Sequence, residues 1–443
     1  MSNPRLTAFH ILLKIENDKA YSNIALNNAI RENRLSGVDS AFVSALVYGV
    51  LERQIMLDYI IKQYSKIPLR KIETKTKLIL RMGIYQLLFM DKVPDSAAVN
   101  ESVNLAKKQK LQKSSGFING ILRSITRAEV PYTLPKEDDK IYYYSIKYAV
   151  PQELVSLWLV SYGEANAIEL MESLSGRSNI YIRVNTLKTD KKSLRTSLEE
   201  SGVECKDVPF LENALCLSHT GSIERLSDYK KGLFHVQDLS SQLCVQLLSP
   251  KRGDMMLDIC SAPGGKAFTA AQEMYNNGKL FACDLYDHKL QLIENGARRL
   301  GIDIILTRKR DGANGESLPL ADKILCDVPC SGLGILSRKP EIRTKDNLIS
   351  AELPALQYQI LCHSAEYLAA GGTLVYSTCT LNPAENGDNV RRFLDEHPDF
   401  YGREITLPNE ITRAINENDY ELTLMPHTAG TDGFYLAVLG RKA

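Results

Sequence analysis

Residues 255–266 read MMLDICSAPGGK, and this stretch decides the fold of the second half of the chain. It begins with an apolar run typical of a buried strand, and Gly264 and Gly265 follow where a helical pattern starts. Glycines at that point let the backbone come close to a ligand at a helix N-terminus, where N–H groups favour an anionic group. The stretch lacks the spacing of both the P-loop and the three-glycine dinucleotide motif.

The rest of this half alternates between strand-like and helical patterns. Further strands are expected at residues 280–283, 302–306, 324–326 and 373–376, and helices at 289–300 and 354–369. This alternation predicts a parallel, doubly wound α/β sheet with its site at the carboxyl ends of the strands.

Asp284 ends the second of these strands, about 20 residues after the glycines, where nucleotide-binding folds place an acidic residue on a ribose diol. The alternative is that Asp284 caps the next helix. Together with the glycine loop, Asp284 describes a pocket for a ligand with a ribose and a carboxylate but no phosphate. S-adenosylmethionine fits that description.

Two cysteines follow the fourth and fifth strands, in loops rich in Pro, Gly, Ser and Thr. Cys330 belongs to the segment that begins at Asp327, and Cys379 to a Ser-Thr-Cys segment. Two thiols beside an activated methyl group suggest covalent catalysis on a poor carbon nucleophile. Carbon-5 of a pyrimidine becomes nucleophilic when a thiolate adds at carbon-6, a carboxylate stabilises the product near ring nitrogen-3, and a base finally removes the carbon-5 proton. One Cys, one Asp and a second Cys supply these parts.

The other cysteines are interpreted differently. Cys244, Cys283 and Cys326 are expected to be small core hydrophobes. The nine cysteines contain no Cys-x-x-Cys pair, which argues against a disulfide framework and a zinc site and favours reduced thiols in the cytosol. No apolar run approaches the roughly 18 residues of a membrane span, and no secretory segment is recognised at the N-terminus. We expect no membrane and no metal, and a monomer.

Residues 5–127 are expected to form helix after helix, including 38–64, about 72–89, and a helix capped by Asp95 or Ser96 that ends near Lys110. Acidic residues between positions 62 and 127 number only four (Glu73, Asp91, Asp95, Glu101). Basic residues there number 14: Lys62, Lys66, Arg70, Lys71, Lys75, Lys77, Arg81, Lys92, Lys107, Lys108, Lys110, Lys113, Arg123 and Arg127. A local excess of +10 in a chain of net charge +1 favours an RNA-binding surface over an ordinary solvated face.

Proline residues and an acidic cluster interrupt the pattern at residues 129–150, where a linker is expected. Two short helices should follow at 152–161 and 164–174. A strand is expected at 180–184, then a helix capped by Thr189 or Asp190 that ends at Glu200, and strand-like pieces near residues 203, 215 and 234. These elements predict a small α/β module.

Three segments carry a resemblance to a known family: residues 257–266, residues 327–332 (DVPCSG) and residues 376–386 (YSTCTLNPAEN). They resemble the signature motifs of the RNA 5-methylcytosine methyltransferases of the Nol1/Nop2/Sun family. The N-terminal helical region resembles the domain of the antitermination factor NusB. The resemblance implies a NusB-like RNA-binding domain (1–128), a linker (129–150), a small α/β adapter module (151–240) and a Rossmann-like class I methyltransferase domain (241–443).

The resemblance also implies roles for individual residues. Cys379 would be the nucleophile and Cys330 would assist release, with Asp327 and Lys266 in the catalytic group. The cofactor S-adenosylmethionine would be bound by Cys260, Ser261, Ala262, Pro263, Gly264, Gly265, Lys266, Asp284, Asp311 and Asp327. The substrate implied is a cytosine of small-subunit (16S) ribosomal RNA or of a small-subunit precursor. Another RNA, such as tRNA or large-subunit rRNA, is the alternative.

Three other functions fit the sequence less well. In a DNA cytosine-5 methyltransferase the Cys of the Pro-Cys segment is itself the nucleophile, but the second candidate, Cys379, and the absence of a large target-recognition insert argue against it. An amino-methyltransferase needs Asn/Asp-Pro-Pro-aromatic, and the segment at Asp327 lacks the aromatic residue. A non-catalytic RNA-binding factor built on an inactive methyltransferase fold is disfavoured by the intact cysteine pair.

Overall fold

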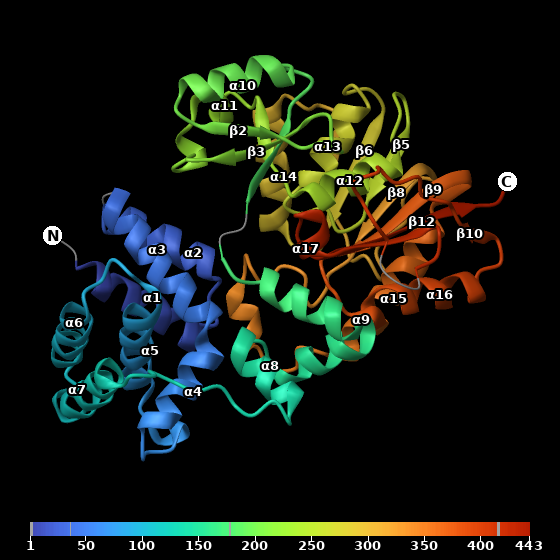
Figure 1. Ribbon diagram of the computed structural model, residues 1–443. Helices are drawn as coiled ribbons and strands as arrows, with labels where there is room; N and C mark the ends of the chain where they lie inside the picture. The colour runs from blue at the N-terminus through green and yellow to red at the C-terminus, as the bar shows by residue number, and fades with distance from the viewer. Residues whose placement is uncertain (1–2, 36, 177–178, 414–416) are drawn as a thin grey trace. The chain divides into compact units, whose positions relative to one another are not determined.

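The computed structural model describes residues 3–35, 37–176, 179–413 and 417–443 (Figure 1). The chain forms two compact units. The helical unit consists of Met1–Gly176 together with Leu336–Leu348, and the sheet unit consists of Arg177–Ile335 together with Ile349–Ala443. A short segment from the second half of the sequence is therefore part of the first unit.

The helical unit confirms the expected succession of helices. Its elements are α1 (Pro4–Asp18), α2 (Ser22–Glu32), α3 (Gly37–Glu52), α4 (Gln54–Tyr64), η1 (Leu69–Lys71), α5 (Thr74–Phe89), α6 (Asp95–Lys108), α7 (Gln112–Arg127), α8 (Lys140–Tyr148), α9 (Gln152–Ser173) and η3 (Pro340–Thr344). The apolar stretch 38–64 forms two helices because the chain bends by 75° between α3 and α4. The expected side-chain cap of α6 is wrong: Pro94 occupies the N-cap position and no side chain caps the helix.

Among the described residues, no single helix combines the length and the apolar composition needed to cross a bilayer, and α3 with α4 reaches them only as a bent pair.

Helix α8 lies within residues 129–150, the stretch expected to be a linker. The acidic cluster there starts a helix, because the Asp139 carboxylate accepts a hydrogen bond from the Tyr142 N–H at 3.0 Å. Helix α9 is interrupted at Gly163, whose φ of 76° and ψ of 163° are not helical. The two short helices predicted at 152–174 are thus confirmed.

The returning segment, Leu336–Leu348, contributes a buried cation to the helical unit. The Arg343 guanidinium is 4% exposed and donates to the carbonyl oxygens of Glu52, Ala149 and Leu174 at 2.8, 3.1 and 3.0 Å. These carbonyls stand at the C-terminal ends of α3, α8 and α9. Helix C-termini leave carbonyls without intrahelical partners and carry partial negative charge, so one guanidinium satisfies three helix ends.

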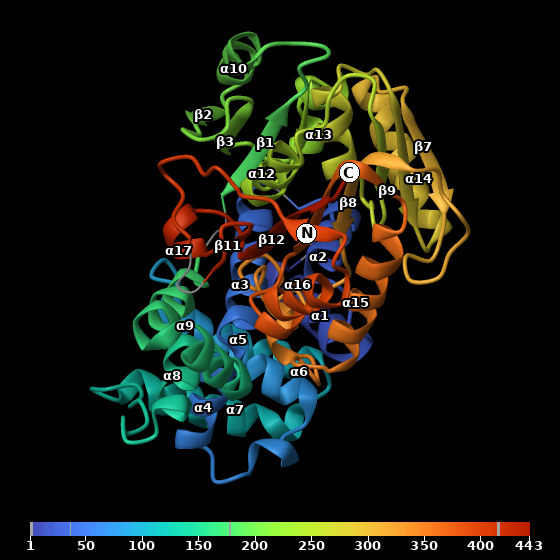
Figure 2. The ribbon, with the colours of Figure 1, turned by 90° about the vertical axis from the view of Figure 1, so that its right-hand side faces the viewer.

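The sheet unit contains two sheets. The smaller one has the order β2-β3-β1-β4, and all of its pairings are antiparallel. Its elements are β1 (Ile180–Val184), α10 (Lys191–Glu200), β2 (Glu204–Asp207), β3 (Ala214–Ser218), η2 (Ile223–Arg225), α11 (Ser227–Lys230) and β4 (Phe234–Val236). Asp190 caps α10 as predicted, and Leu194 and Leu198 of that helix share an apolar cluster with residues of the small sheet. Helix α10 lies beside β2 and β3 (Figure 2).

The larger sheet has the order β10-β12-β9-β8-β5-β6-β7, with β11 paired to β12. Its strands are β5 (Met255–Asp258), β6 (Lys279–Asp284), β7 (Ile305–Lys309), β8 (Ala321–Asp327), β9 (Leu368–Thr378), β10 (Phe400–Gly402), β11 (Glu421–Leu424) and β12 (Phe434–Arg441). Strands β5 to β9 pair in parallel, which confirms the predicted doubly wound sheet, although β7 begins later than expected. The antiparallel β12 beside β9 was not predicted.

Helices cover both faces of this sheet (Figure 1). They are α12 (Leu239–Leu248), α13 (Gly265–Glu273), α14 (Asp287–Leu300), α15 (Glu352–Ala365), η4 (Pro383–Glu385), α16 (Gly387–Glu396) and α17 (Pro426–Ala429). One apolar cluster joins the sheet to α12–α14, and a second joins it to α15 and α16. Cys244, Cys283 and Cys326 are fully buried in this unit, as predicted for core side chains.

Candidate active site

The three sequence motifs occupy loops that follow three neighbouring strands. The glycine loop follows β5, the Asp327 segment ends β8, and Cys379 comes directly after β9. Strands β5, β8 and β9 are adjacent and parallel, so their carboxyl ends meet at one edge of the sheet. The sheet order therefore brings together segments that are up to about 120 residues apart in the sequence.

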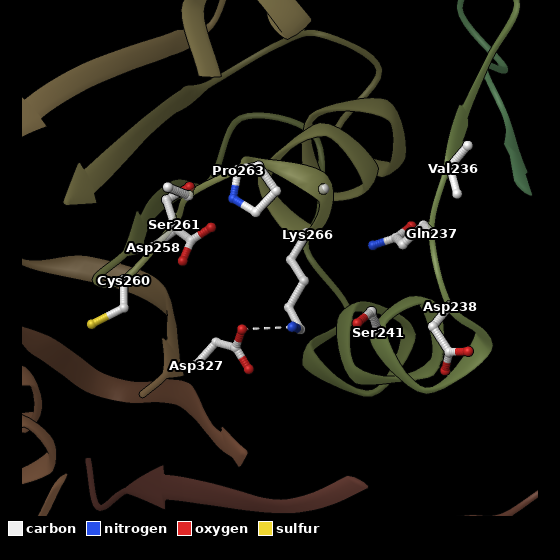
Figure 3. A pocket seen from close by; sticks show the side chains of 12 residues that line it. Val236, Gln237, Asp238, Ser241, Asp258, Cys260, Ser261, Pro263, Lys266 and Asp327 are labelled. Carbon is white, nitrogen blue, oxygen red and sulfur yellow. Dashed lines mark hydrogen bonds and ion pairs between the residues drawn. The ribbon is translucent and has the colours of Figure 1, made fainter. Parts of the chain in front are cut away.

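A cavity opens at this edge (Figure 3). Its lining residues are Val236, Gln237, Asp238, Ser241, Asp258, Cys260, Ser261, Ala262, Pro263, Gly265, Lys266 and Asp327. Most residues expected to bind the cofactor lie in this lining; Gly264, Asp284 and Asp311 do not. Gly264 has a φ of 103°, which favours glycine, and a Cβ there would come within 2.5 Å of the Phe268 ring.

Lys266 and Asp327 point toward one another in the cavity (Figure 3). Lys266 Nζ donates to Asp327 Oδ2 at 2.6 Å, and the Ser377 hydroxyl donates to Asp327 Oδ1 at 2.7 Å. Burial lowers the pKa of Lys266, but the charge and hydrogen bond of Asp327, together with Cys244 and Asp258, outweigh it and the net shift is upward. Both Asp327 oxygens are therefore held in place at the end of β8.

Asp258, the last residue of β5, lines the same cavity and was not singled out in the sequence as a binding residue. Both of its carboxylate oxygens are buried without a hydrogen-bond partner in the described part of the chain. Burial raises the pKa of Asp258 to about 7; the nearby Ser261 hydroxyl opposes this shift and the Asp327 carboxylate adds to it. A buried carboxylate without a partner is unfavourable, so a cationic ligand group would be stabilised beside it.

Asp284 and Asp311 lie outside the lining. Asp284 is 7% exposed and accepts a hydrogen bond from the Tyr286 N–H at 3.2 Å. The alternative that Asp284 caps α14 is wrong, because Tyr286 occupies the N-cap position. The end of β6 is nevertheless next to the glycine loop, since Ser261 N donates to the Cys283 carbonyl at 2.8 Å.

The structure brings Cys330 and Cys379 into contact, with 3.1 Å between their Sγ atoms. Its interaction with Cys379 and its burial raise the pKa of the Cys330 thiol well above the usual range, and the charge of Glu385 adds to the shift. Two adjacent thiols, one of which strongly retains its proton, are suited to separate nucleophilic and proton-transfer roles. Among the described residues, no group of three or more His, Cys, Asp or Glu side chains is arranged to hold a metal ion.

Sequence reasoning missed the wall of the cavity formed by residues 236–241. Gln237 and Asp238 follow β4 directly and Ser241 belongs to α12, so the chain reaches the cavity where the small sheet ends. No motif marks these residues. The only sequence signal is the Asp238 cap of α12, whose carboxylate accepts from the Ser240 N–H at 2.9 Å.

The basic segment of the helical unit includes one residue that does not belong to a surface. Arg81 is 2% exposed, and its guanidinium donates to both Asp58 oxygens at 2.7 Å. The inclusion of Arg81 in a polyanion-binding surface is therefore a wrong interpretation, since this side chain forms a buried ion pair. The exposed lysines at positions 107, 108 and 110 keep the character that the sequence indicated.

A doubly wound sheet with a glycine loop after its central strand and a ligand cavity at the carboxyl edge defines the class of Rossmann-like methyltransferase folds. Residues 245–440 match the family model of the 16S rRNA methyltransferase RsmB/F, residues 2–127 match the NusB family, and residues 150–224 match the ferredoxin-like domain of RsmF/B-like methyltransferases. The chain belongs to the 16S rRNA methyltransferase RsmB/F family. These matches confirm the resemblances seen in the sequence.

Full-length relatives support this assignment. The chain is 36% identical over 442 residues to the probable ribosomal RNA small subunit methyltransferase B of Bacillus subtilis, covering 98% of each chain. It is also 36% identical over 446 residues to the Synechocystis protein of the same name, covering 99% of each. The crystal structure of the protein PH0851 has the same fold, with a TM-score of 0.84, 24% identity, and coverage of 100% of this chain and 99% of the other.

Proposed function

We propose that this protein transfers a methyl group from S-adenosylmethionine to carbon-5 of a cytosine in small-subunit (16S) ribosomal RNA, in the cytoplasm. Family membership and the names of the full-length relatives support the rRNA substrate. The observation that carries the reaction type is the contact of two thiols, Cys330 and Cys379. Cys330 follows Asp327 of the cavity lining by three residues, and Cys379 follows by two residues Ser377, which donates to Asp327. Cytosine carbon-5 requires covalent activation, which a nucleophilic thiol and a second proton-transfer group can provide.

The cavity fits the chemistry of S-adenosylmethionine. The unpartnered Asp258 carboxylate suits the ligand ammonium group, and the N-terminus of α13 suits its carboxylate. Asp284, at the end of β6, is the candidate partner of the ribose diol, and Asp311 lies on the same side of the sheet, just after β7. The bound cofactor supplies an electrophilic methyl group on a sulfonium.

Different side chains would carry out different steps of the proposed methyl transfer. The Cys379 thiolate adds to carbon-6 of the cytosine, and the electron pair of the carbon-5–carbon-6 double bond forms the new bond from carbon-5 to the methyl group as the methyl–sulfonium bond breaks. Ring nitrogen-3 takes up a proton from solvent as the thiolate adds, and Asp327, held by Lys266 and Ser377, stabilises the protonated nitrogen. Cys330 releases its own proton to solvent and then takes the carbon-5 proton as a thiolate, whose raised pKa favours proton uptake. The double bond re-forms, the bond from carbon-6 to Cys379 breaks and leaves Cys379 as a thiolate, and nitrogen-3 returns its proton to solvent.

Two single variants test these roles. Cys379→Ala removes the thiolate that attacks the ring and should abolish both methylation and any covalent protein–RNA adduct. Cys330→Ala should complete attack and methyl transfer but stall before elimination, so an adduct that survives denaturing electrophoresis should accumulate. A stable adduct with Cys379→Ala and none with Cys330→Ala would reverse the two roles.

Bisulfite mapping tests the substrate. RNA from a strain that lacks this protein should lose 5-methylcytosine at one position of 16S rRNA, and wild-type protein but not Cys379→Ala should restore it. Loss of the signal in tRNA or in large-subunit rRNA instead would establish the alternative substrate. Turnover on purified 16S rRNA compared with small-subunit precursors would then identify the form of RNA that is methylated.

A further inference from the structure

Two adjacent side chains outside the cavity lie between the two cysteine loops. Glu385 is the last residue of η4, and Asn386 joins it to α16, six and seven residues after Cys379. Glu385 is 1% exposed and Asn386 is 3% exposed. Buried polar side chains are costly unless their hydrogen bonds are made, so their partners show what these residues hold in place.

Glu385 holds the Cys330 loop. Its carboxylate accepts from the Ser331 N–H at 2.9 Å and from the Ser331 hydroxyl at 2.5 Å, and Ser331 directly follows Cys330. It also accepts from Gln357 Nε2 at 2.9 Å and Asn382 Nδ2 at 3.0 Å. Four donors match the acceptor capacity of an ionised carboxylate, whereas an amide would turn its own N–H groups toward donors.

Gln357 strengthens this attachment. Its Nε2 also donates to the carbonyl of Pro329 at 2.8 Å, on the other side of Cys330. The residues before and after Cys330 are therefore both tied to the same buried group of side chains. Such double attachment leaves the Cys330 backbone little freedom to move away from the facing thiol.

Asn386 holds the Cys379 loop in the same way. Its Oδ1 accepts from the Thr378 hydroxyl at 2.6 Å, and its Nδ2 donates to the Thr380 carbonyl at 3.0 Å. Thr378 and Thr380 are the two neighbours of Cys379 in the sequence. The loops are also joined directly, since the hydroxyls of Ser331 and Thr380 are 2.7 Å apart. Because Ser331 gives its proton to Glu385, Thr380 is the donor in that bond.

We propose that Glu385 and Asn386 are positioning residues that keep the two thiols in contact, Glu385 by fixing Cys330 and Asn386 by fixing Cys379. The consequence for catalysis rests on the proposed function, whereas the consequence for the thiol spacing does not. Loss of Glu385 should impair the step assigned to Cys330, and loss of Asn386 should impair the step assigned to Cys379. Displacement of a reacting group by about 1 Å can cost about 100-fold in rate, so weakened positioning should be measurable without loss of the fold.

The spacing is tested with dibromobimane, a reagent that becomes fluorescent when it links two nearby thiols. All proteins carry Cys205→Ala, because Cys205 and Cys216 lie on the paired strands β2 and β3 and would otherwise form a second cross-link. In this background the cross-link should form in the parent protein and not with Cys330→Ala, and Glu385→Gln and Asn386→Ala should both slow its formation. Matched controls are Glu421→Gln and Asn389→Ala, which alter a buried Glu and a buried Asn that donate to or accept from neither cysteine loop. Cross-linking of all four variants at the wild-type rate would overturn the proposal.

The catalytic consequence is tested with 16S rRNA and S-adenosylmethionine. Glu385→Gln should lower turnover by about 100-fold and accumulate the covalent adduct, as Cys330→Ala does, while Asn386→Ala should form little adduct. Cofactor affinity should be unchanged in both variants, which also shows that they are folded. If Glu385→Gln fails to bind the cofactor, Ser331→Ala removes only the bridging hydroxyl and should accumulate adduct to a smaller extent.

The outcomes separate the two proposals. Slower cross-linking in the two variants with no adduct in any protein, wild type included, would refute the proposed reaction and keep the positioning role. If adduct accumulates in Cys330→Ala, but Glu385→Gln and Asn386→Ala show the same adduct levels as Glu421→Gln and Asn389→Ala, the positioning role is refuted.

Discussion

The Arg343→Met variant examines how a segment from the second half of the sequence stabilises the helical unit. Arg343 donates to the terminal carbonyls of three helices and is 4% exposed. Methionine keeps most of the side-chain volume but offers no donor, so the carbonyls of Glu52, Ala149 and Leu174 would lose a charged partner.

The magnitude follows from the three hydrogen bonds. A hydrogen bond to a charged group contributes about 1.5–3 kcal/mol, and three of them set an upper range of about 4.5–9 kcal/mol. The carbonyls share one donor group, and water can reach helix ends once the guanidinium is gone, so the terms are not additive. Removal of one partner of a buried charged interaction costs about 3–5 kcal/mol, which is the loss of unfolding free energy that we expect.

Urea unfolding followed by tryptophan fluorescence measures this loss. Trp158 is the single tryptophan of the sequence, is fully buried, and lies in α9, so its emission reports on the helical unit. Arg123→Met is the matched control, because Arg123 is exposed and donates to the Asn119 side chain within its own helix, and it should change stability by less than about 0.5 kcal/mol. If the two variants unfold at the same urea concentration, the three-helix contact contributes nothing and the reasoning fails.

Three further results are expected. Replacement of the exposed lysines at 107, 108 and 110 by Glu should weaken rRNA binding and reduce its salt dependence without changing cofactor affinity. Replacement of the exposed Lys14, Lys192 and Lys279 by Glu is the control and should weaken rRNA binding less. Equal effects on rRNA binding would refute a localised RNA-binding surface. Asp284→Ala should weaken S-adenosylmethionine binding by about 10- to 100-fold in calorimetry while RNA binding persists, and an unchanged dissociation constant would contradict the ribose assignment. The pKa of Asp258 is raised to about 7, so its carboxylate ionises as pH rises, and cofactor affinity should increase between about pH 6 and 7.5 by up to about tenfold per pH unit. Asp258→Asn should bind the cofactor weakly and without this pH dependence. The same pH dependence in that variant would exclude Asp258 as its source.

The periodic parts of the fold could be predicted because local patterns determine them. Apolar runs predicted strands β5 to β9, and their alternation with helical patterns predicted the parallel sheet. The antiparallel β12 could not be predicted, because it pairs with β9 through contacts between residues about 60 positions apart. The acidic residues near Asp139 predicted a linker but begin helix α8, because acidic residues are common both in loops and at helix N-caps.

Some residues of the candidate site could be predicted from the sequence, and others could not. The glycine loop, Asp327, Cys330 and Cys379 carry short motifs, and their types and positions after strands suffice to place them at one edge. Asp258 could not be predicted as a binding residue, because only its burial without a hydrogen-bond partner distinguishes it from any other Asp at the end of a strand. Residues 236–241 could not be predicted either, since no local pattern shows that the segment after the small sheet lines a cavity at the ends of β5 and β8.

By itself, the sequence determined the class of fold, the motifs that carry the proposed chemistry and the basic character of the N-terminal helices, because each is written in residues close together in the chain. Only the tertiary structure decided that Arg81 is buried against Asp58, that Arg343 returns to the helical unit, and that Glu385 bonds to the residue after Cys330. These contacts join residues between 23 and 291 positions apart. No periodicity or spacing encodes such pairs, because burial and hydrogen-bond geometry exist only once the chain has folded and water has been excluded from around them.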